Sequence, residues 1–423
     1  MNIRQSLLQL NESSSDDDDE ISFAEYHIFH QPSHSKRKHD GSIPGHLVKF
    51  RDRQAGHARM YQDYLAENST FSLTDFRRRY RMSRDLFKRI MAAVEDHDDY
   101  FKFKFNAAST PGLSCFQKVT AVFRMITYGV AADATDEYVR IGESTVIESL
   151  KKFVKAIIKV FGDEYLRAPN EMDTSRLLAI GQERGFPGML GSIDCMHWRW
   201  KNCPSSWHGM YSCHLHEPTI ILEVVASQNL WIWHAFFGLP GSHNDINVLH
   251  RSPLFSKLAE GQAPQVYYNI NGHDYTMGYY LADGIYPSWA TFVKTIPEPQ
   301  GNKRKYFAKA QEAVRKDVER AFGVLQSRFA IVRGPAHFWD QETLGDIMKA
   351  CVIMHNMIVE DEGEVDPDER FQDGGDNVQP SHDQHPDLDE FIETHRKIRD
   401  KETHHQLQQD LVEHLWQHHS DQY

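Results

Sequence analysis

The sequence predicts an α/β protein in which an all-helical segment precedes a mixed β-sheet. Apolar residues recur at helical spacing between residues 70 and 170, and runs of branched and aromatic residues bounded by Gly and Pro follow between 185 and 290. At 423 residues the chain is long enough for two or three domains. We expect a tail at 1–45, a helical domain at 46–175, an α/β domain at 176–360, and an acidic linker with a final helix at 361–423.

Composition excludes several classes of protein. No run of about 18 apolar residues is present, so we expect no membrane span. The N-terminus lacks the apolar core of a secretory signal. Five cysteines, an odd number scattered along the chain, favour a reducing compartment.

The net charge of −13 is unevenly distributed. Residues 360–423 carry 19 acids and 5 bases, and residues 1–20 carry six acids and one base. Subtracting these 14 and 5 negative charges from −13 leaves +6 for residues 21–359. A mildly basic body between acidic ends permits a polyanionic partner.

The polar tail at 1–45 has too little apolar surface to order itself, so we expect it to be disordered. Its basic cluster KRKH at 36–39 is typical of nuclear import signals and predicts a location in the nucleus.

In the helical domain, residues 72–97 have an apolar face behind a basic one, and a second helix runs from 113 to a stop near Gly129. Two further helices are expected on either side of Gly142, with Ser144 as N-cap. This is the outline of a helix-turn-helix, in which Ser144 to Lys155 would be the recognition helix. The alternative is a helical bundle that only packs.

The α/β domain has strand signals at four places: 188–200, 218–228, 230–241 and 277–287. A helix at 245–261 separates the third strand from the fourth, and a longer one at 308–329 follows the fourth. This order predicts a mixed sheet of the ribonuclease-H type. A buried helix is expected at 346–360, and a last helix should dock on the body or on a partner through residues that share one face, namely Leu407, Leu411 and Leu415.

Four carboxylates lie in or at the ends of the expected strands and helices of this domain: Asp194, Asp245, Asp283 and Glu319. Three of them have ordinary structural explanations. Asp245 could form a capping box with Ser242, Asp283 could be a turn residue, and Glu319 could pair with Arg315. Asp194 has none, because an isolated acid in the middle of an apolar strand is costly unless it is compensated.

A divalent metal would compensate these acids. Mg²⁺ and Mn²⁺ prefer carboxylate oxygens, and two such ions about 4 Å apart can clamp the attacking and leaving oxygens of a phosphodiester. Adjacent strand ends and one facing helix can gather three or four carboxylates from distant parts of a sequence. The set therefore predicts a two-ion site.

Four motifs in order, GSIDCMHW, GSHNDINVL, YYLADGIYP and VERAFGVLQSRF, resemble the PIF/Harbinger transposases and their domesticated nuclease relatives, in the plant-type branch. The resemblance runs from about residue 75 to 360. It implies that Asp194, Asp283 and Glu319 form the catalytic triad of a ribonuclease-H fold, with Asp245 as a further metal ligand. It also implies DNA cutting and joining at transposon ends and a Myb-like accessory DNA-binding protein as partner. A homo-oligomer is a further expectation, which the sequence itself does not decide.

The choice between Asp283 and Asp245 as second triad acid stays open, and we favour Asp283 because it ends the strand expected beside Asp194. Around Glu319, nine bases against three acids between residues 303 and 333 favour contact with DNA phosphates. The bases expected to make these contacts are Arg315, Lys316 and Arg320.

Alternatives of other classes remain. A non-catalytic DNA-binding or scaffold protein derived from a transposase would keep the fold, and a hydrolase of small phosphate esters would share the acids. A zinc site could be built from seven residues within 22 positions, although their spacing matches no CxxC pattern. They are Cys195, His197, Cys203, His208, Cys213, His214 and His216.

Overall fold

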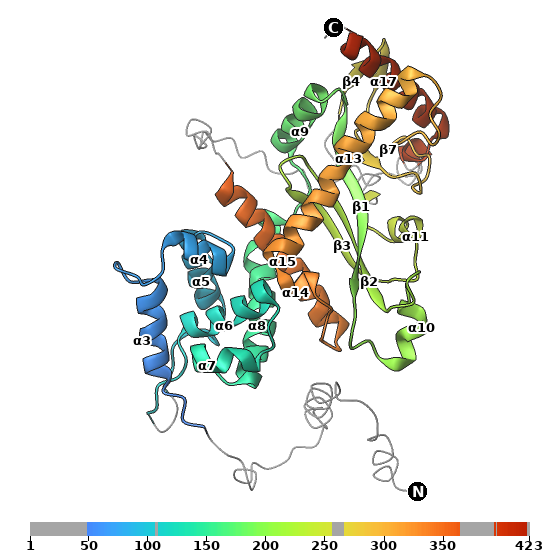
Figure 1. Ribbon diagram of the computed structural model, residues 1–423. Helices are drawn as coiled ribbons and strands as arrows, with labels where there is room; N and C mark the ends of the chain where they lie inside the picture. Colours follow the sequence, from blue (N-terminus) through green and yellow to red (C-terminus); the bar gives the residue numbers. More distant parts are fainter. Residues whose placement is uncertain (1–48, 106–108, 256–265, 364–392, 395, 421–423) are drawn as a thin grey trace, which may run out of the picture. The chain divides into compact units, whose positions relative to one another are not determined.

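The computed structural model describes residues 49–105, 109–255, 266–363, 393–394 and 396–420. The predicted tail at 1–45, its KRKH cluster and most of the acidic linker lie outside these residues. Contacts divide the chain into Met1–Phe50 and Arg51–Tyr423, and every element below belongs to the second unit (Figure 1). Within the described residues, no helix is long and apolar enough to cross a membrane.

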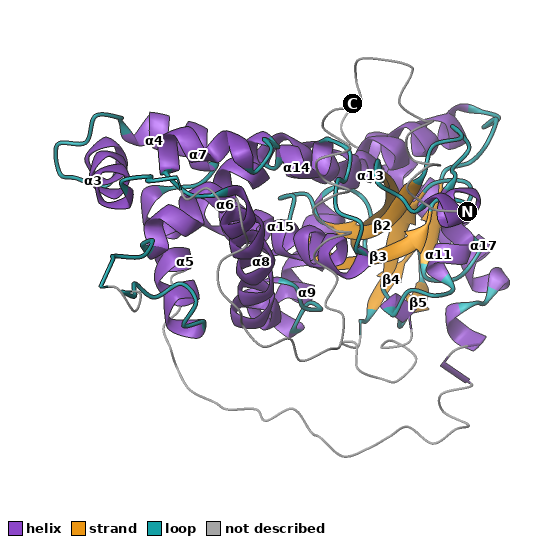
Figure 2. Cartoon of the chain, turned by 90° about the horizontal axis from the view of Figure 1, so that it is seen from below, coloured by secondary structure: helices purple, strands orange, loops and turns teal. Residues whose placement is uncertain are grey.

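The N-terminal part of this unit is helical, as predicted, and Figure 2 shows its helices gathered to one side of the strands. Its helices are α3 (Arg53–Tyr64), α4 (Leu73–Tyr80), α5 (Arg84–His97), α6 (Cys115–Tyr128), η1 (Asp133–Thr135), α7 (Asp136–Val139), α8 (Glu143–Tyr165) and α9 (Glu171–Glu183).

The apolar pattern at 72–97 forms two helices and not one. Arg81 ends α4 in a left-handed conformation with φ of 62°, and the Ser83 hydroxyl accepts a hydrogen bond from the Leu86 amide to cap α5. The predicted stop of the next helix is confirmed, because Gly129 ends α6 at φ of 65°, which costs glycine little.

The break at Gly142 is confirmed, but Ser144 is not the N-cap. Gly142 itself is the N-cap of α8, and Ser144 lies inside the first turn. The preceding helix α7 has only four residues, and α8 buries its apolar face against α5, α6 and a later helix, α15 (Gln341–Glu362). These contacts match the packed bundle, and contact of α8 with DNA stays a prediction.

The sheet has five strands in the order β3-β2-β1-β6-β7. β1 pairs antiparallel with β2, and β2 with β3, whereas β6 lies parallel to β1 and β7 parallel to β6. The bounds of these strands are β1 (Met189–Arg199), β2 (Thr219–Ala226), β3 (Ile232–Pro240), β6 (Tyr279–Ala282) and β7 (Phe292–Lys294). The four predicted strands are present. The three-residue strands β4 (Tyr268–Ile270), β5 (His273–Tyr275) and β7 were not predicted.

Helices connect the strands and cover the sheet. Two turns, η2 (Ser205–Trp207) and α10 (His208–Tyr211), follow β1, and α11 (Asp245–Leu249) follows β3. The long helix α13 (Asn302–Arg328) crosses β1, and α14 (Ala330–Arg333) continues from it. α13 begins six residues before the predicted start. Of the helix expected at 245–261, residues 256–261 lie outside the described part.

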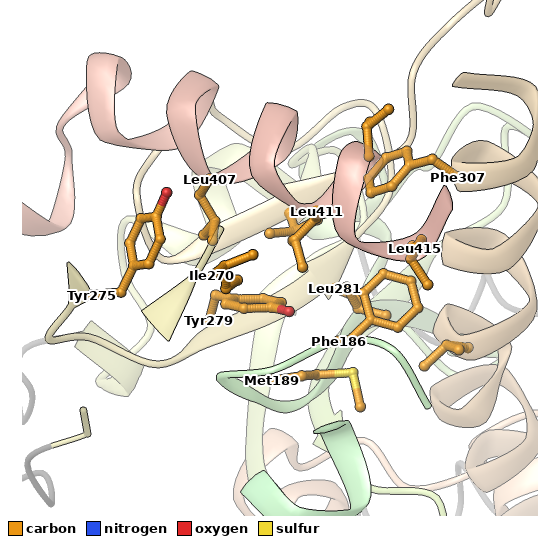
Figure 3. Packing of buried hydrophobic residues seen from close by; sticks show 13 residues of the cluster. Phe186, Met189, Ile270, Tyr275, Tyr279, Leu281, Phe307, Leu407, Leu411 and Leu415 are labelled. Carbon is orange, nitrogen blue, oxygen red and sulfur yellow. The ribbon is translucent and has the colours of Figure 1, made fainter. Parts of the chain in front are cut away.

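The last helix, α17 (Lys401–Ser420), docks on the sheet domain, as the leucine spacing predicted. Leu407, Leu411 and Leu415 are buried in one cluster with Phe186 and Phe307 (Figure 3). Asp410 anchors the same helix, because its carboxylate accepts hydrogen bonds from Tyr275 and lies 2.9 Å from a ring nitrogen of His273. The core of the sheet domain therefore includes residues far along the chain.

Truncating Leu411 tests this docking. The side chain is fully buried, so Leu411→Ala should lower the free energy of unfolding by about 2–5 kcal/mol. Urea denaturation measures the change. Gln409→Ala, at an exposed position of the same helix, is the control and should change it by less than about 0.5 kcal/mol. Equal effects of the two substitutions would contradict the packing of α17.

Candidate active site

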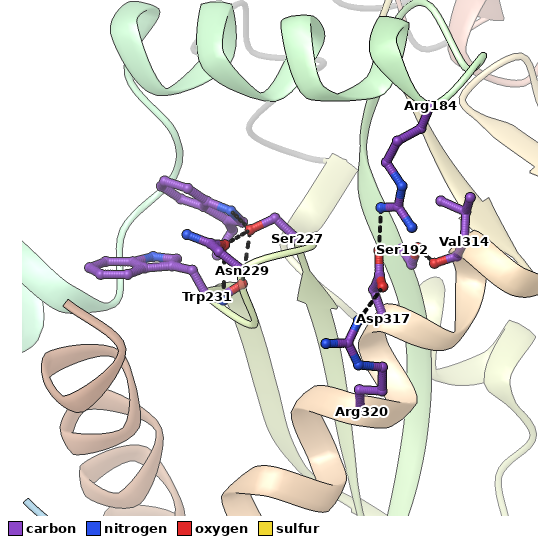
Figure 4. Close-up of polar contacts among 9 residues, drawn as sticks. Arg184, Ser192, Ser227, Asn229, Trp231, Val314, Asp317 and Arg320 are labelled. Carbon is purple, nitrogen blue, oxygen red and sulfur yellow. Dashed lines mark hydrogen bonds and ion pairs between the residues drawn. The ribbon is translucent and has the colours of Figure 1, made fainter. Parts of the chain in front are cut away.

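Alternation along β1 directs two of its residues toward α13. The Ser192 hydroxyl donates a hydrogen bond of 3.4 Å to the carbonyl of Val314, a contact drawn in Figure 4. Two positions further, the Asp194 carboxylate meets Arg315, one residue further along α13. Ile193 and Cys195 point to the opposite face, where Ile193 packs in an apolar cluster with Tyr286.

Asp194 has a clearly raised pKa. Burial raises its pKa to about 6, while the Cys195 amide, which donates a hydrogen bond of 2.8 Å, and the Arg315 guanidinium oppose the rise. The negative charges of Asp245 and Asp283 raise the pKa further. Asp194 is therefore compensated in part by the protein itself, and it carries repulsion from two other acids.

Asp283 lies beside Asp194 at the end of the neighbouring strand. Ser192 pairs with Leu281 in the parallel ladder of β1 and β6, and the two aspartates stand two residues beyond this pair. The Asp283 carboxylate also accepts a hydrogen bond of 2.9 Å from the Ile285 amide, which is the turn role considered from the sequence. The turn leaves the second carboxylate oxygen available to other partners.

Asp245 reaches the same neighbourhood from the other face. It is the first residue of α11, whose N-cap is Asn244, so the capping box with Ser242 is not formed. The Cys195 side chain, whose sulfur lies 3.6 Å from the Tyr286 hydroxyl, is near enough to the Asp245 carboxylate to lower its pKa. Burial, and then the charge of Asp283, raise the pKa of Asp245.

Glu319 is brought to Asp194 by Arg315. The guanidinium Nη1 lies 3.3 Å from Asp194 Oδ2, and Nη2 lies 2.9 Å from Glu319 Oε1. The pairing of Glu319 with Arg315, considered from the sequence, is thus confirmed, but the same guanidinium also holds Asp194. The side chain of Arg315 is only 17% exposed, whereas that of Glu319 is 45% exposed.

The other two bases expected to contact DNA differ from Arg315 in their exposure. Lys316 and Arg320 are exposed on α13. Arg320 also lies 3.1 Å from the carboxylate of Asp317, a buried acid that forms a second ion pair with Arg184 (Figure 4). These contacts fix α13 against the sheet domain and leave basic side chains on its outer surface.

The donor set fits a divalent metal by its chemistry but not as it is arranged here. Carboxylate oxygens are the preferred ligands. The pKa values of Asp194 and Asp245 are raised first by burial and then by the charges of neighbouring acids, and a bound cation would offset both costs. Across the described part of the chain, however, no three His, Cys, Asp or Glu side chains are gathered as a ready metal site. Arg315 lies between two of the expected ligands.

One buried acid was missed by the sequence argument. Glu223 on β2 is opposite Cys195 in the ladder and has no exposed surface. One carboxylate oxygen lies 3.1 Å from Nε2 of His234, while the other has no hydrogen-bond partner in the described structure. The signal was present, because an acid within the run IILEVV is as conspicuous as Asp194 in its strand.

The residues considered for zinc have other partners. His197 Nδ1 lies 2.9 Å from the Thr219 hydroxyl, and His208 Nε2 lies 2.9 Å from the carbonyl of Cys203. Cys203 and Cys213 are buried free thiols. His197 is thus an exposed residue of β1 and His208 an exposed residue of α10, whereas the two thiols are buried.

The perturbed Asp194 predicts a pH-dependent stability in the metal-free protein. Its pKa of about 6 exceeds the ordinary 3.8, so the folded chain binds more protons than the unfolded chain between these values. The free energy of unfolding contributed by this group therefore falls as the pH rises from about 4 through about 6. Asp194→Asn should be more stable than the parent at pH 8 by about 1–3 kcal/mol, and the difference should vanish below about pH 4.

Urea denaturation in EDTA across this pH range measures the difference. A variant less stable than the parent at pH 8 would contradict the prediction, because the Arg315 pair would then outweigh the cost of burial.

Three comparisons place these features among known proteins. Residues 163–366, which contain all four acids, match a family model described as plant transposon protein, and residues 56–95 match one described as a domain of unknown function. A protein named ALP1-like from Arabidopsis thaliana is 21% identical over 296 residues, which cover 68% of this chain and 71% of that protein. No solved structure matches. Together with the four motifs, these matches identify the chain as a protein related, at low identity, to the PIF/Harbinger-type transposases.

Proposed function

We propose that the chain is a nuclear, divalent-metal-dependent DNA endonuclease and transposase. The observation that carries the proposal is the placement of acids from four distant segments around one strand, β1. Asp194 on β1 and Asp283, directly after β6, each lie two residues beyond the Ser192–Leu281 pair. Glu319 on α13 is tied to Asp194 through Arg315. Asp245 adds its charge from α11.

The fold supports the same proposal. Three antiparallel strands, followed by two parallel strands on the other side of β1, agree with the ribonuclease-H type of sheet that the element order predicted. In that arrangement the first acid lies on the central strand, the second follows the adjacent parallel strand, and the third comes from a helix across the sheet. The positions of Asp194, Asp283 and Glu319 in this chain are compatible with that arrangement and support Asp283 as the proposed second triad acid.

In the proposed reaction, Asp194 and Asp283 would hold Mg²⁺ or Mn²⁺ from the sheet, and Glu319 would bind from α13 and orient water. Two such ions, when bound, supply activation of the attacking oxygen and stabilisation of the leaving oxygen of a phosphodiester. Hydrolysis at a transposon end would free a 3′-hydroxyl, which would then attack target DNA. Lys316 and Arg320, exposed on α13, would hold DNA phosphates without reading sequence.

DNA is the proposed substrate, and a Myb-like protein that binds transposon ends is the proposed partner, as the resemblance implies. Self-association belongs to the same proposal. A second candidate is a non-catalytic DNA-binding or scaffold protein. It is favoured by one observation: Arg315 satisfies Asp194 and Glu319 without any metal, as a purely structural role would require.

The deciding experiment is nicking of supercoiled DNA by the purified full-length protein in Mn²⁺. We expect nicking by the parent and none by Asp194→Ala, with Asp274→Ala, an exposed acid on β5, as the matched control that stays active. Equal nicking by Asp194→Ala and the parent, or none by a folded parent, would favour the non-catalytic candidate.

The two remaining aspartates should differ in effect. Removal of a direct metal ligand abolishes phosphoryl transfer, whereas removal of a supporting acid costs about 10–100-fold. Asp283→Ala should therefore be inactive, and Asp245→Ala should retain activity reduced by about that factor. Because the Asp245 carboxylate also lies near Cys195 at the start of α11, its loss should lower the melting temperature more. The reverse order of activities would assign the second triad position to Asp245.

Binding to DNA should weaken steeply with salt, because phosphate contacts release counterions. Lys316→Ala and Arg320→Ala should each reduce the slope of log K against log salt by about 1, measured by fluorescence anisotropy. Neutralising the ten acids of residues 364–392 by Asn and Gln should tighten binding. This variant is preferable to a truncation, which would remove α17 from the core. Salt-independent binding would contradict the nucleic-acid assignment.

A further inference from the structure

Arg315 on α13 is largely buried and joins two acids from different elements. Its guanidinium nitrogens reach one carboxylate oxygen each, at 3.3 Å for Asp194 and 2.9 Å for Glu319. It is 17% exposed, whereas the side chain of Arg320, five positions on, is 59% exposed. The fork of an arginine suits such a bridge, because its donors are fixed in one plane and its charge is permanent.

The bridged carboxylates, Asp194 and Glu319, are two of those that the proposed function assigns to a metal. The positive charge of Arg315 therefore lies between two proposed ligands of the divalent metal. A guanidinium and a divalent ion repel each other, and both draw on the negative charge of the same two carboxylates. Both cannot be fully bound by Asp194 and Glu319 at once.

We propose that Arg315 is a positioning residue that holds Asp194 and Glu319 together in the metal-free protein, is displaced when a divalent metal binds, and then donates to a DNA phosphate. The inference rests on the proposed function, since it concerns the same carboxylates. After displacement, the charged guanidinium of Arg315 would lie beside the ion and next to Glu319, whose side chain is partly exposed to solvent. Phosphate oxygens match that guanidinium as well as carboxylates do.

The bridge makes a prediction about metal affinity that does not involve activity. Removing Arg315 removes a competitor, so Arg315→Ala should bind Mn²⁺ about tenfold more tightly than the parent, measured by isothermal titration of the full-length chain at pH 8. A tenfold change corresponds to about 1.4 kcal/mol. Lys316→Ala is the matched control, since it removes the same charge from the next, exposed position and should change the affinity much less.

The melting temperature gives a second readout. Without metal, Arg315→Ala should melt below Lys316→Ala, because Asp194 loses its ion pair. Saturating Mn²⁺ should raise the melting temperature of Arg315→Ala by more than that of the parent. If Arg315→Ala does not fold, Arg315→Lys replaces it. A lysine can bridge less well, so its Mn²⁺ affinity should lie above that of the parent.

DNA binding completes the test. Before nicking is detectable, Mn²⁺ should strengthen duplex binding by the parent more than by Arg315→Ala, while Lys316→Ala should weaken binding equally with and without Mn²⁺. Unchanged or weaker Mn²⁺ affinity in the Arg315 variants, or an undiminished metal-induced gain in DNA binding, would overturn the inference. A parent that binds no Mn²⁺, with variants that bind none either, would instead overturn the proposed metal-dependent function.

Discussion

A carboxylate in the middle of the central strand is the constraint on which the arrangement around it depends. Asp194 pairs with Val224 of β2 and accepts a hydrogen bond from the Cys195 amide of its own strand. A charged partner for it comes from above the sheet, where α13 supplies Arg315. Arg315 reaches Asp194 only if α13 keeps a fixed position and rotation over the sheet. Gln311 helps to fix the helix, because its amide donates hydrogen bonds to the carbonyls of Ala282 on β6 and Val293 on β7.

The strand itself divides the acids between two environments. Asp194 faces the long helix α13, which has basic residues on its outer surface. Cys195, on the opposite face of β1, lies beside the buried Glu223 and near Asp245. Charges on the two sides still act on one another, because the negative charge of Asp245 contributes to the raised pKa of Asp194. A change at α11 would therefore be felt at α13 through the field of the acids and not through a contact between the helices.

The sequence patterns were informative where periodicity and burial coincide. The four longest strands of the sheet domain, the stop at Gly129 and the apolar face of α17 all follow from such patterns. The split of the helix at Arg81 was not predictable, because a left-handed arginine has no compositional signal. The roles of Arg315 were also beyond reach, since spacing on a helix indicates the pair with Glu319 but not a partner 121 residues away on a strand. Spacing likewise gives no register, which is what sets Asp283 level with Asp194.

The docking of α17 has a consequence for how this chain is made. Phe186, Met189 and Tyr279 share one apolar cluster with Leu407 and Leu411, which follow Met189 by more than two hundred positions. During synthesis the sheet domain therefore emerges from the ribosome with one wall of its core uncovered, and it stays so until residues 401–420 have left the exit tunnel. Over that interval the exposed strand face is a surface for chaperones, and its protection depends on the rate at which the acidic segment before α17 is translated.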